Sequence, residues 1–124
     1  MKSLATALTV TGVLLTAAAS AAQQAMTAGD LQQLCVGSDH VSQNACRIYI
    51  LGVTQGIAVG MHIADGKSRA GRPCVPAGIS AEALELMLKR KLAGLASPAD
   101  RDGDASGFIA AALICAYPCT KEGH

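Results

Sequence analysis

Four stretches of this chain carry apolar residues at the three- and four-residue spacing of amphipathic helices, and short polar segments separate them. The first stretch follows Thr27, whose hydroxyl is placed to cap a helix over residues 28–36. The second opens at Ser42 or Asn44 and runs to about Ala64, with one apolar stripe along its length: Cys46, Ile50, Val53, Ile57, Met61 and Ala64. Because this stripe is continuous, we expect the second stretch to be the core helix.

The second half of the chain predicts two more helices. Ser80 is placed to cap a third helix, with a buried stripe at Ala81, Leu84, Leu88, Leu92 and Leu95. We expect residues 97–98, Ser-Pro, to stop it and residues 100–104 to form a charged turn. A last helix should span roughly residues 105–117 and end at Pro118. The pattern therefore predicts an all-α fold, a small bundle of about four helices.

Three glycines lie four residues apart on the expected core helix: Gly52, Gly56 and Gly60. Each costs about 1 kcal/mol of helix propensity relative to alanine, so the bare face needs a packing partner. We expect this face to pack against another helix, either in the same chain or in a second copy. Membrane insertion of residues 48–64 is the weaker interpretation, because the stretch is short and contains Thr54, Gln55 and His62.

Residues 1–22 have the composition of a secretory signal. Lys2 supplies a positive start, residues 4–18 form an apolar run, and small residues follow at 19–22. An uncleaved membrane anchor would need a longer apolar span. We therefore expect a cleaved signal, export to the periplasm, and a single helical domain over residues 23–124.

Composition narrows the classes of partner. The chain has ten Lys and Arg and nine Asp and Glu, and removal of Lys2 with the signal leaves the two signs balanced. Binding to nucleic acid or to an anionic membrane depends on excess positive charge, so neither is expected. Aromatic residues are nearly absent (Tyr49, Phe108 and Tyr117), which also favours packed helices over a β-sandwich.

Residues for catalysis or metal binding are scattered. The histidines are His40 in an expected loop, His62 near the end of the core helix and His124 at the terminus, and no spacing joins them to a serine or cysteine nucleophile. Cys115, Cys119 and His124 would offer a metal three ligands, but Pro118 and the exported context favour a disulfide. We expect no enzyme activity, no cofactor and no metal.

The five cysteines all lie beyond the signal, where the compartment is oxidising. A tight hairpin of the first two helices would bring Cys35 to Cys46. Cys74 would then pair with Cys119 over a long range, leaving Cys115 as a free, buried thiol. A Cys74–Cys115 bond is the alternative pairing, and the spacing alone does not decide between them.

Three segments together resemble the Rap/Tai family: CRIYILGVTQGI from Cys46, CVPAGIS from Cys74, and ALICAYPC ending at Cys119. Members of that family include periplasmic immunity proteins of type VI secretion systems, which neutralise peptidoglycan amidase effectors. The family's core-helix tyrosine and glycine match Tyr49 and Gly52, and its four cysteines match Cys35, Cys46, Cys74 and Cys119. Cys115 falls where the family has no cysteine.

The resemblance implies a non-enzymatic inhibitor, expected to be a homodimer, that blocks the active site of an amidase effector with a loop. Residues 65–72 and 97–104 carry most of the loop charge. We expect partner binding at Lys67, Arg69 and Arg72. The alternative function is a periplasmic acid-stress chaperone, although such a protein would be expected to carry more carboxylates than this balanced chain.

Overall fold

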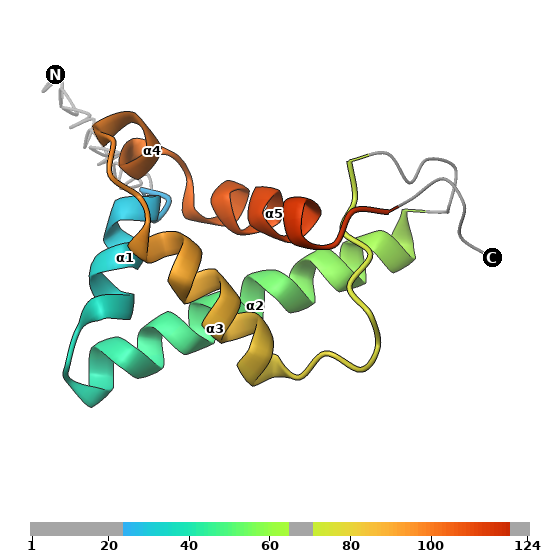
Figure 1. The fold of residues 1–124 in the computed structure, drawn as a ribbon, viewed down its shortest axis with the longest axis horizontal. Helices are drawn as coiled ribbons and strands as arrows, with labels where there is room; N and C mark the ends of the chain where they lie inside the picture. The colour runs from blue at the N-terminus through green and yellow to red at the C-terminus, as the bar shows by residue number, and fades with distance from the viewer. Residues whose placement is uncertain (1–23, 65–70, 120–124) are drawn as a thin grey trace, which may run out of the picture.

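The computed structural model describes residues 24–64 and 71–119, and this part of the chain is all-α, as the sequence predicted. Five helices follow one another: α1 (Ala28–Val36), α2 (His40–Ile63), α3 (Ala81–Ala93), α4 (Pro98–Asp102) and α5 (Ala105–Ala116). The expected signal over residues 1–22, together with Lys67, Arg69 and His124, lies outside the described residues. Figure 1 shows α2 running the length of the bundle, with α3 crossing in front of it and α5 lying above it.

Local capping determines where the helices begin. Thr27 and Asp30 form a reciprocal capping box at α1, and the Ser80 hydroxyl accepts a hydrogen bond from the Ala83 amide at α3. The predicted start of α2 was wrong. The Asp39 carboxylate, rather than Ser42 or Asn44, caps the helix by accepting a hydrogen bond from the Ser42 amide at 2.8 Å. His40 is therefore the first residue of α2 and does not lie in a loop.

The region between α3 and α5 also differs from the prediction. Helix α3 ends at Ala93, before the Ser-Pro pair, and the expected turn at 100–104 is largely the short helix α4. The Ser97 hydroxyl caps α4 and Pro98 occupies its first turn, where a proline lacks no required hydrogen bond. Asp104 then caps α5. The same Ser-Pro pair therefore starts one helix instead of stopping another.

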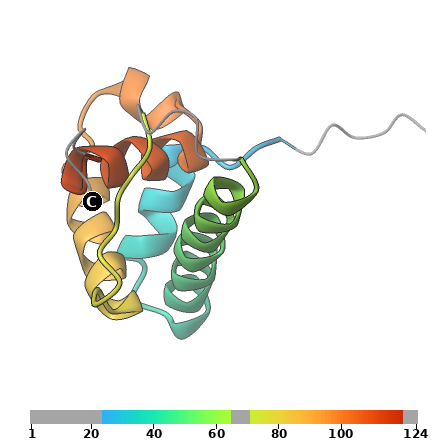
Figure 2. The same ribbon diagram turned by 90° about the vertical axis from the view of Figure 1, so that its right-hand side faces the viewer.

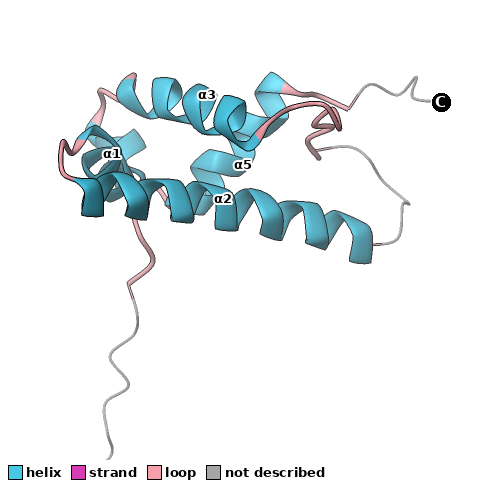
Figure 3. Ribbon diagram, turned by 90° about the horizontal axis from the view of Figure 1, so that it is seen from below, coloured by secondary structure: helices cyan, strands magenta, loops and turns pink. Residues whose placement is uncertain are grey.

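The core lies where α1, α3 and α5 meet the inner side of α2. Its largest fully buried side chains are Leu31, Ile50, Leu88, Leu92, Ile109 and Leu113. The first half of α2 contributes the buried residues Cys46 and Ile50 to this core, and the partly buried Val53 and Ile57 pack against it. Met61 is half-buried and Ala64 is exposed. Ala81, expected in the stripe of α3, is also exposed. Seen from below, α2 runs along one edge of the bundle (Figure 3).

Two disulfides connect distant parts of the described chain. Cys35 in α1 is joined to Cys46 in α2, with 5.1 Å between the Cα atoms. Cys74 is joined to Cys119 with a Cα–Cα distance of 4.9 Å and a sequence separation of 45, so this bond closes the longer loop. Next to it, the Cys74 amide donates to the Tyr117 carbonyl at 2.7 Å. The segment after α5 is thus attached to the segment before α3.

Cys115 is a free thiol, but the prediction that it is buried was wrong, since it is exposed. The buried line of α5 runs through Ala105, Ile109, Ala112 and Leu113. At 3.6 residues per turn, Cys115 lies roughly 100° around the helix from the centre of that line. Spacing placed it near apolar neighbours, but the rotation of α5 against the core turns it to the surface.

Candidate partner-binding surfaces

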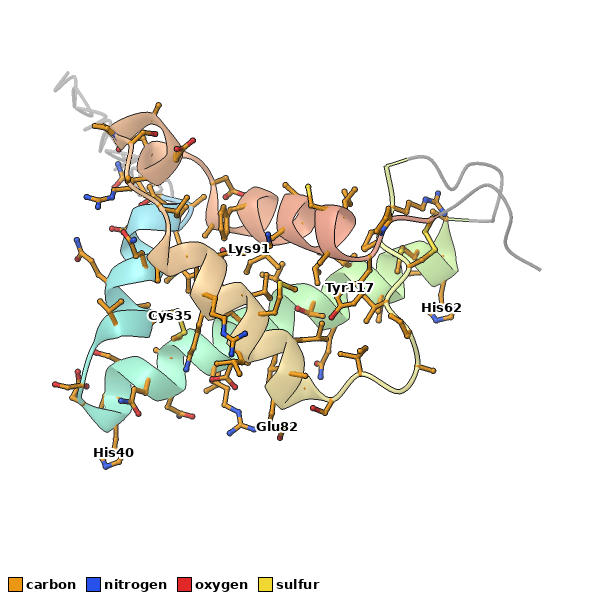
Figure 4. All side chains as sticks on the ribbon, viewed as in Figure 1. Cys35, His40, His62, Glu82, Lys91 and Tyr117 are labelled. Carbon is orange, nitrogen blue, oxygen red and sulfur yellow. A yellow bond between two sulfur atoms is a disulfide. The ribbon has the colours of Figure 1, made fainter. Side chains whose placement is uncertain are left out.

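The described residues do not gather chemical groups at one point. His40 and His62 project from opposite ends of α2 (Figure 4), and His62 is exposed. No group of three or more His, Cys, Asp or Glu side chains in residues 24–64 and 71–119 is arranged to hold a metal ion. All fully buried side chains of this part are uncharged. The surfaces of the bundle are therefore the candidates for function.

Of the three predicted contact residues Lys67, Arg69 and Arg72, the structure describes Arg72. Its Nη1 donates a hydrogen bond to the Ala64 carbonyl oxygen at 3.2 Å, at the C-terminal end of α2. A cation at this end of a helix also interacts favourably with the helix dipole. Arg72 therefore anchors the end of the loop to α2, while the positions of Lys67 and Arg69 are outside the described residues.

The second predicted binding segment, residues 97–104, is held firmly against α1. The Ala28 amide donates to the Gly103 carbonyl at 2.8 Å, and the Ala105 amide donates to the Met26 carbonyl at 3.0 Å. From the other side, the Arg101 guanidinium contacts the Leu95 carbonyl at 3.3 Å. These bonds fix α4 while leaving its own side chains exposed. It is a preordered protrusion that displays charges of both signs.

Gln32 supports this protrusion from below. Its side-chain amide donates to the Leu92 carbonyl at 2.7 Å and to the Leu95 carbonyl at 3.2 Å. A side chain of α1 thus supplies hydrogen-bond donors to two carbonyls at and just after the end of α3, where carbonyls have no donor within the helix. Nothing in the sequence pattern marked Gln32, because its partners lie about 60 residues away in the chain. The end of α3, just before residues 97–104, is thus held by a contact that periodicity does not reveal.

Three carboxylates that cap helices have lowered pKa values. Hydrogen bonds from the Ser106 hydroxyl and the Gly107 amide lower the pKa of Asp104, and bonds from Thr27 and Ser42 lower the pKa of Asp30 and Asp39 in the same way. Burial, followed by the negative charge of Asp104, raises the pKa of Tyr49. These groups stabilise helix ends and form no reactive site.

The outer face of α2 has no helix packed on its glycines among the described residues. We use this name for the exposed aliphatic side chains Val41, Ile48, Val59 and Ile63, together with Gly52, Gly56 and Gly60, which lie between them. A Cβ atom built at any of the three glycines meets no described atom within 4 Å. The expected packing partner within the chain is therefore absent from the described residues. Figure 2 shows α2 at the edge of the bundle.

Helix α2 is also the one described helix that is long and apolar enough to cross a membrane, and little of its most apolar window is buried. The core helix of a bundle satisfies the same criterion, and Cys46 and Ile50 on the inner side are completely buried against the other helices. We therefore treat α2 as a bundle helix with an uncovered outer face.

An apolar cavity of about 330 Å³ lies beside the second half of α2. The segment after Arg72, α3 and α5 each contribute residues to its lining. Its apolar lining includes Ile57, Met61, Pro73, Val75, Leu84 and Leu113. Residues of the second half of α2 are thus less tightly packed than those of the first half.

Comparison with known families gives one match. The model of the family described as Rap1a immunity proteins matches residues 27–119. This range begins at the N-cap of α1 and ends at the last disulfide cysteine, so it includes all five helices. Neither the curated proteins nor the solved structures contain a match.

Proposed function

The chain belongs to the Rap1a immunity protein family, and on this basis we propose that it is a periplasmic immunity protein that inhibits a peptidoglycan amidase effector by occluding its active site. Family membership supports binding to a protein effector. The match over residues 27–119 carries the proposal, because it spans the folded domain and not an isolated motif. The amidase as target comes from the resemblance of residues 46–57 and the two later segments to the Rap/Tai proteins.

Export to the periplasm is part of this proposal. Residues 1–22 would direct secretion and be removed, leaving the helical domain from residue 23. Two disulfides support an oxidising compartment, because cytosolic thiols are kept reduced. They also support a binding role. A rigid domain of this size loses little conformational freedom on association, which lowers the free-energy cost of binding.

Inhibition would need no chemistry from this chain. We propose that the loop of residues 65–72 enters or covers the effector's active site, with Lys67, Arg69 and Arg72 contacting the partner. The bond from Arg72 to Ala64 supports this placement, because it fixes one end of the loop. The protrusion at residues 97–104 is the second candidate surface, and its backbone is already ordered by α1.

We also propose that the protein is a homodimer. The uncovered outer face of α2 supports this, because an aligned row of exposed aliphatic side chains often marks an interaction site. The acid-stress chaperone gains no such support. Acid-driven opening would be favoured by carboxylates buried in the core, and the fully buried residues of the described chain are all uncharged.

Co-expression in the periplasm tests the proposal. A host that exports a peptidoglycan amidase effector encoded beside this chain should lyse alone and survive when the full chain is co-expressed. A chain lacking residues 1–22 should give no protection, because it would stay in the cytoplasm. An amidase with an inactivated nucleophile is the control for toxicity unrelated to cleavage. Lysis that continues despite abundant, exported and oxidised protein would refute the proposed inhibition.

A further inference from the structure

We propose that the apolar cavity beside the second half of α2 binds a single aliphatic chain of about twelve carbons with an uncharged hydroxyl head, the chemistry of a medium-chain fatty alcohol. This binding is independent of effector inhibition. It follows from three features of the cavity: its volume, its lining and the segment that holds it open.

The volume of the cavity sets the size of the ligand. At about 330 Å³ it is roughly twice as large as an engineered apolar cavity of about 150 Å³ that binds benzene, a ring of six carbons. An occupant of about twelve carbons therefore fits. Water would fill the space poorly, because each buried water needs about two to four polar partners and the floor consists of aliphatic and proline side chains.

The floor of the cavity is apolar and belongs to the core. Leu84 of α3 and Leu113 of α5 are buried, and Ile57 of α2 packs against the same core. No Asp, Glu, Lys or Arg belongs to the described lining. An aliphatic chain would leave water on entering, and each buried methylene group should strengthen binding about fourfold.

A braced segment, which we call the strap, holds the cavity open from residue 72 to residue 75. The disulfide between Cys74 and Cys119 and the bond from the Cys74 amide to the Tyr117 carbonyl join the strap to the segment after α5. At its start, Arg72 donates to a carbonyl at the end of α2. Figure 1 shows this yellow segment passing the ends of α5 and α2. A strap fixed at two points resists collapse onto α2, so the space persists although protein interiors are normally close-packed.

The polar side chains of the lining all come from α2. Gln55 and His62 are exposed and lie two turns apart on the same side of the helix. The Thr54 hydroxyl donates to the Ile50 carbonyl at 2.8 Å, and its oxygen can still accept a hydrogen bond. An alcohol head both donates and accepts, so it suits these groups. A carboxylate head would lose water without gaining a lysine or arginine partner from the described lining.

Chain length provides the first test. The mature, oxidised protein is titrated in a calorimeter with a series of 1-alkanols from 1-hexanol to 1-tetradecanol, each below its solubility limit. Affinity should rise about fourfold for each added methylene and stop rising near 1-dodecanol, because further carbons lie outside the cavity. Decanoate should bind about tenfold more weakly than 1-decanol, since its charge gains no partner.

Substitutions in the lining separate the cavity from the rest of the surface. Ala58→Leu should lower the affinity for 1-decanol about tenfold by filling the opening, and it should leave the fold intact because Ala58 is exposed and leucine is a good helix former. Val75→Ala should shift the plateau to a longer chain by enlarging the cavity. Ala93→Leu, exposed at the far end of α3, is the matched control and should bind like the wild type. Thermal melting checks the fold of each variant.

Failure of every alkanol to bind the wild-type protein would overturn the proposal. An affinity that keeps rising beyond 1-dodecanol and is unchanged in Ala58→Leu would also overturn it, because the chains would then adsorb to the outer face of α2. Tighter binding of decanoate than of 1-decanol would overturn the uncharged head. None of these results depends on the periplasmic protection assay, so failure of this site and failure of effector inhibition remain distinguishable.

Discussion

The first half of α2, up to Val53, and the second half, from Thr54, differ in what surrounds them. In the first half, Cys46 and Ile50 are completely buried, and a disulfide joins the helix to α1. Arg47 contacts Glu82 and Glu85 of α3, each at 3.5 Å. The second half contains no fully buried residue and no Asp, Glu, Lys or Arg. The first half therefore belongs to the scaffold, and the second half is available to partners.

Loss of a disulfide should have the largest effect on the free energy of unfolding. The size of the loss should differ between the two disulfides. Replacing Cys74 and Cys119 with serine should lower the free energy of unfolding by about 4 kcal/mol, because this bond closes the longer loop. The same change at Cys35 and Cys46 should cost about 3 kcal/mol. Denaturant unfolding of both variants measures the difference. An equal loss of stability in the two variants would mean that loop length does not determine which disulfide stabilises the fold more.

Truncation of core side chains should show the same contrast within one helix. Ile50→Ala should lower the free energy of unfolding by about 2 to 5 kcal/mol, because its side chain is fully buried. Ile57→Ala, next to the apolar cavity, should cost about 1 kcal/mol, since its side chain is already partly in contact with solvent. Equal losses on chemical denaturation would contradict the division of α2 into a scaffold half and an available half.

Lowering the pH should reduce the stability that the helix caps contribute, whereas the buried core of the described chain contains no ionised side chain. The pKa values of Asp30, Asp39 and Asp104 are lowered in the folded protein, so these carboxylates contribute stability that is fully present above their unfolded pKa of about 4. That stability is lost as the pH falls through the lower folded values. Thermal midpoints should thus be flat between pH 7 and 5 and fall below pH 4. Opening and client binding already at pH 5 would instead favour the chaperone.

Charge reversal in the loop after α2 should have the smallest effect on stability. Lys67→Glu and Arg69→Glu, combined with Arg72→Gln, should change the free energy of unfolding by less than about 0.5 kcal/mol each and weaken effector binding. Glutamine is chosen at position 72 because a negative charge beside the Ala64 carbonyl would destabilise the end of α2. Reversal of Asp100 and Asp102 in α4 is the matched test of the other surface. Full protection by the loop variant would move the proposed contact to residues 97–104.

Local signals in the sequence predicted most of the fold. Thr27 and Ser80 marked their helices correctly, because each cap bonds to an amide only three residues away. Asp39 was missed because Ser42 and Asn44 offered competing caps, and α4 was missed because Ser97-Pro98 suits either the end or the start of a helix. No local rule distinguishes these choices without the rest of the fold.

Features that depend on tertiary packing could not be predicted from the sequence. The exposure of Cys115 depends on how α5 is rotated against the core, and the role of Gln32 depends on carbonyls at the far end of α3. The pattern did identify Gly52, Gly56 and Gly60 as a bare face. It did not reveal that α2 lies at an edge of the bundle, where this face has no neighbour among the described residues.

Titration of the purified, oxidised mature protein into the cognate amidase tests the central claim most directly. The measured quantity is cleavage of cross-linked peptidoglycan peptides at a fixed enzyme concentration. Inhibition by occlusion predicts that activity falls linearly and stops at a fixed molar ratio, and that the denatured, reduced protein has no effect. Full amidase activity in the presence of excess folded protein would contradict the account.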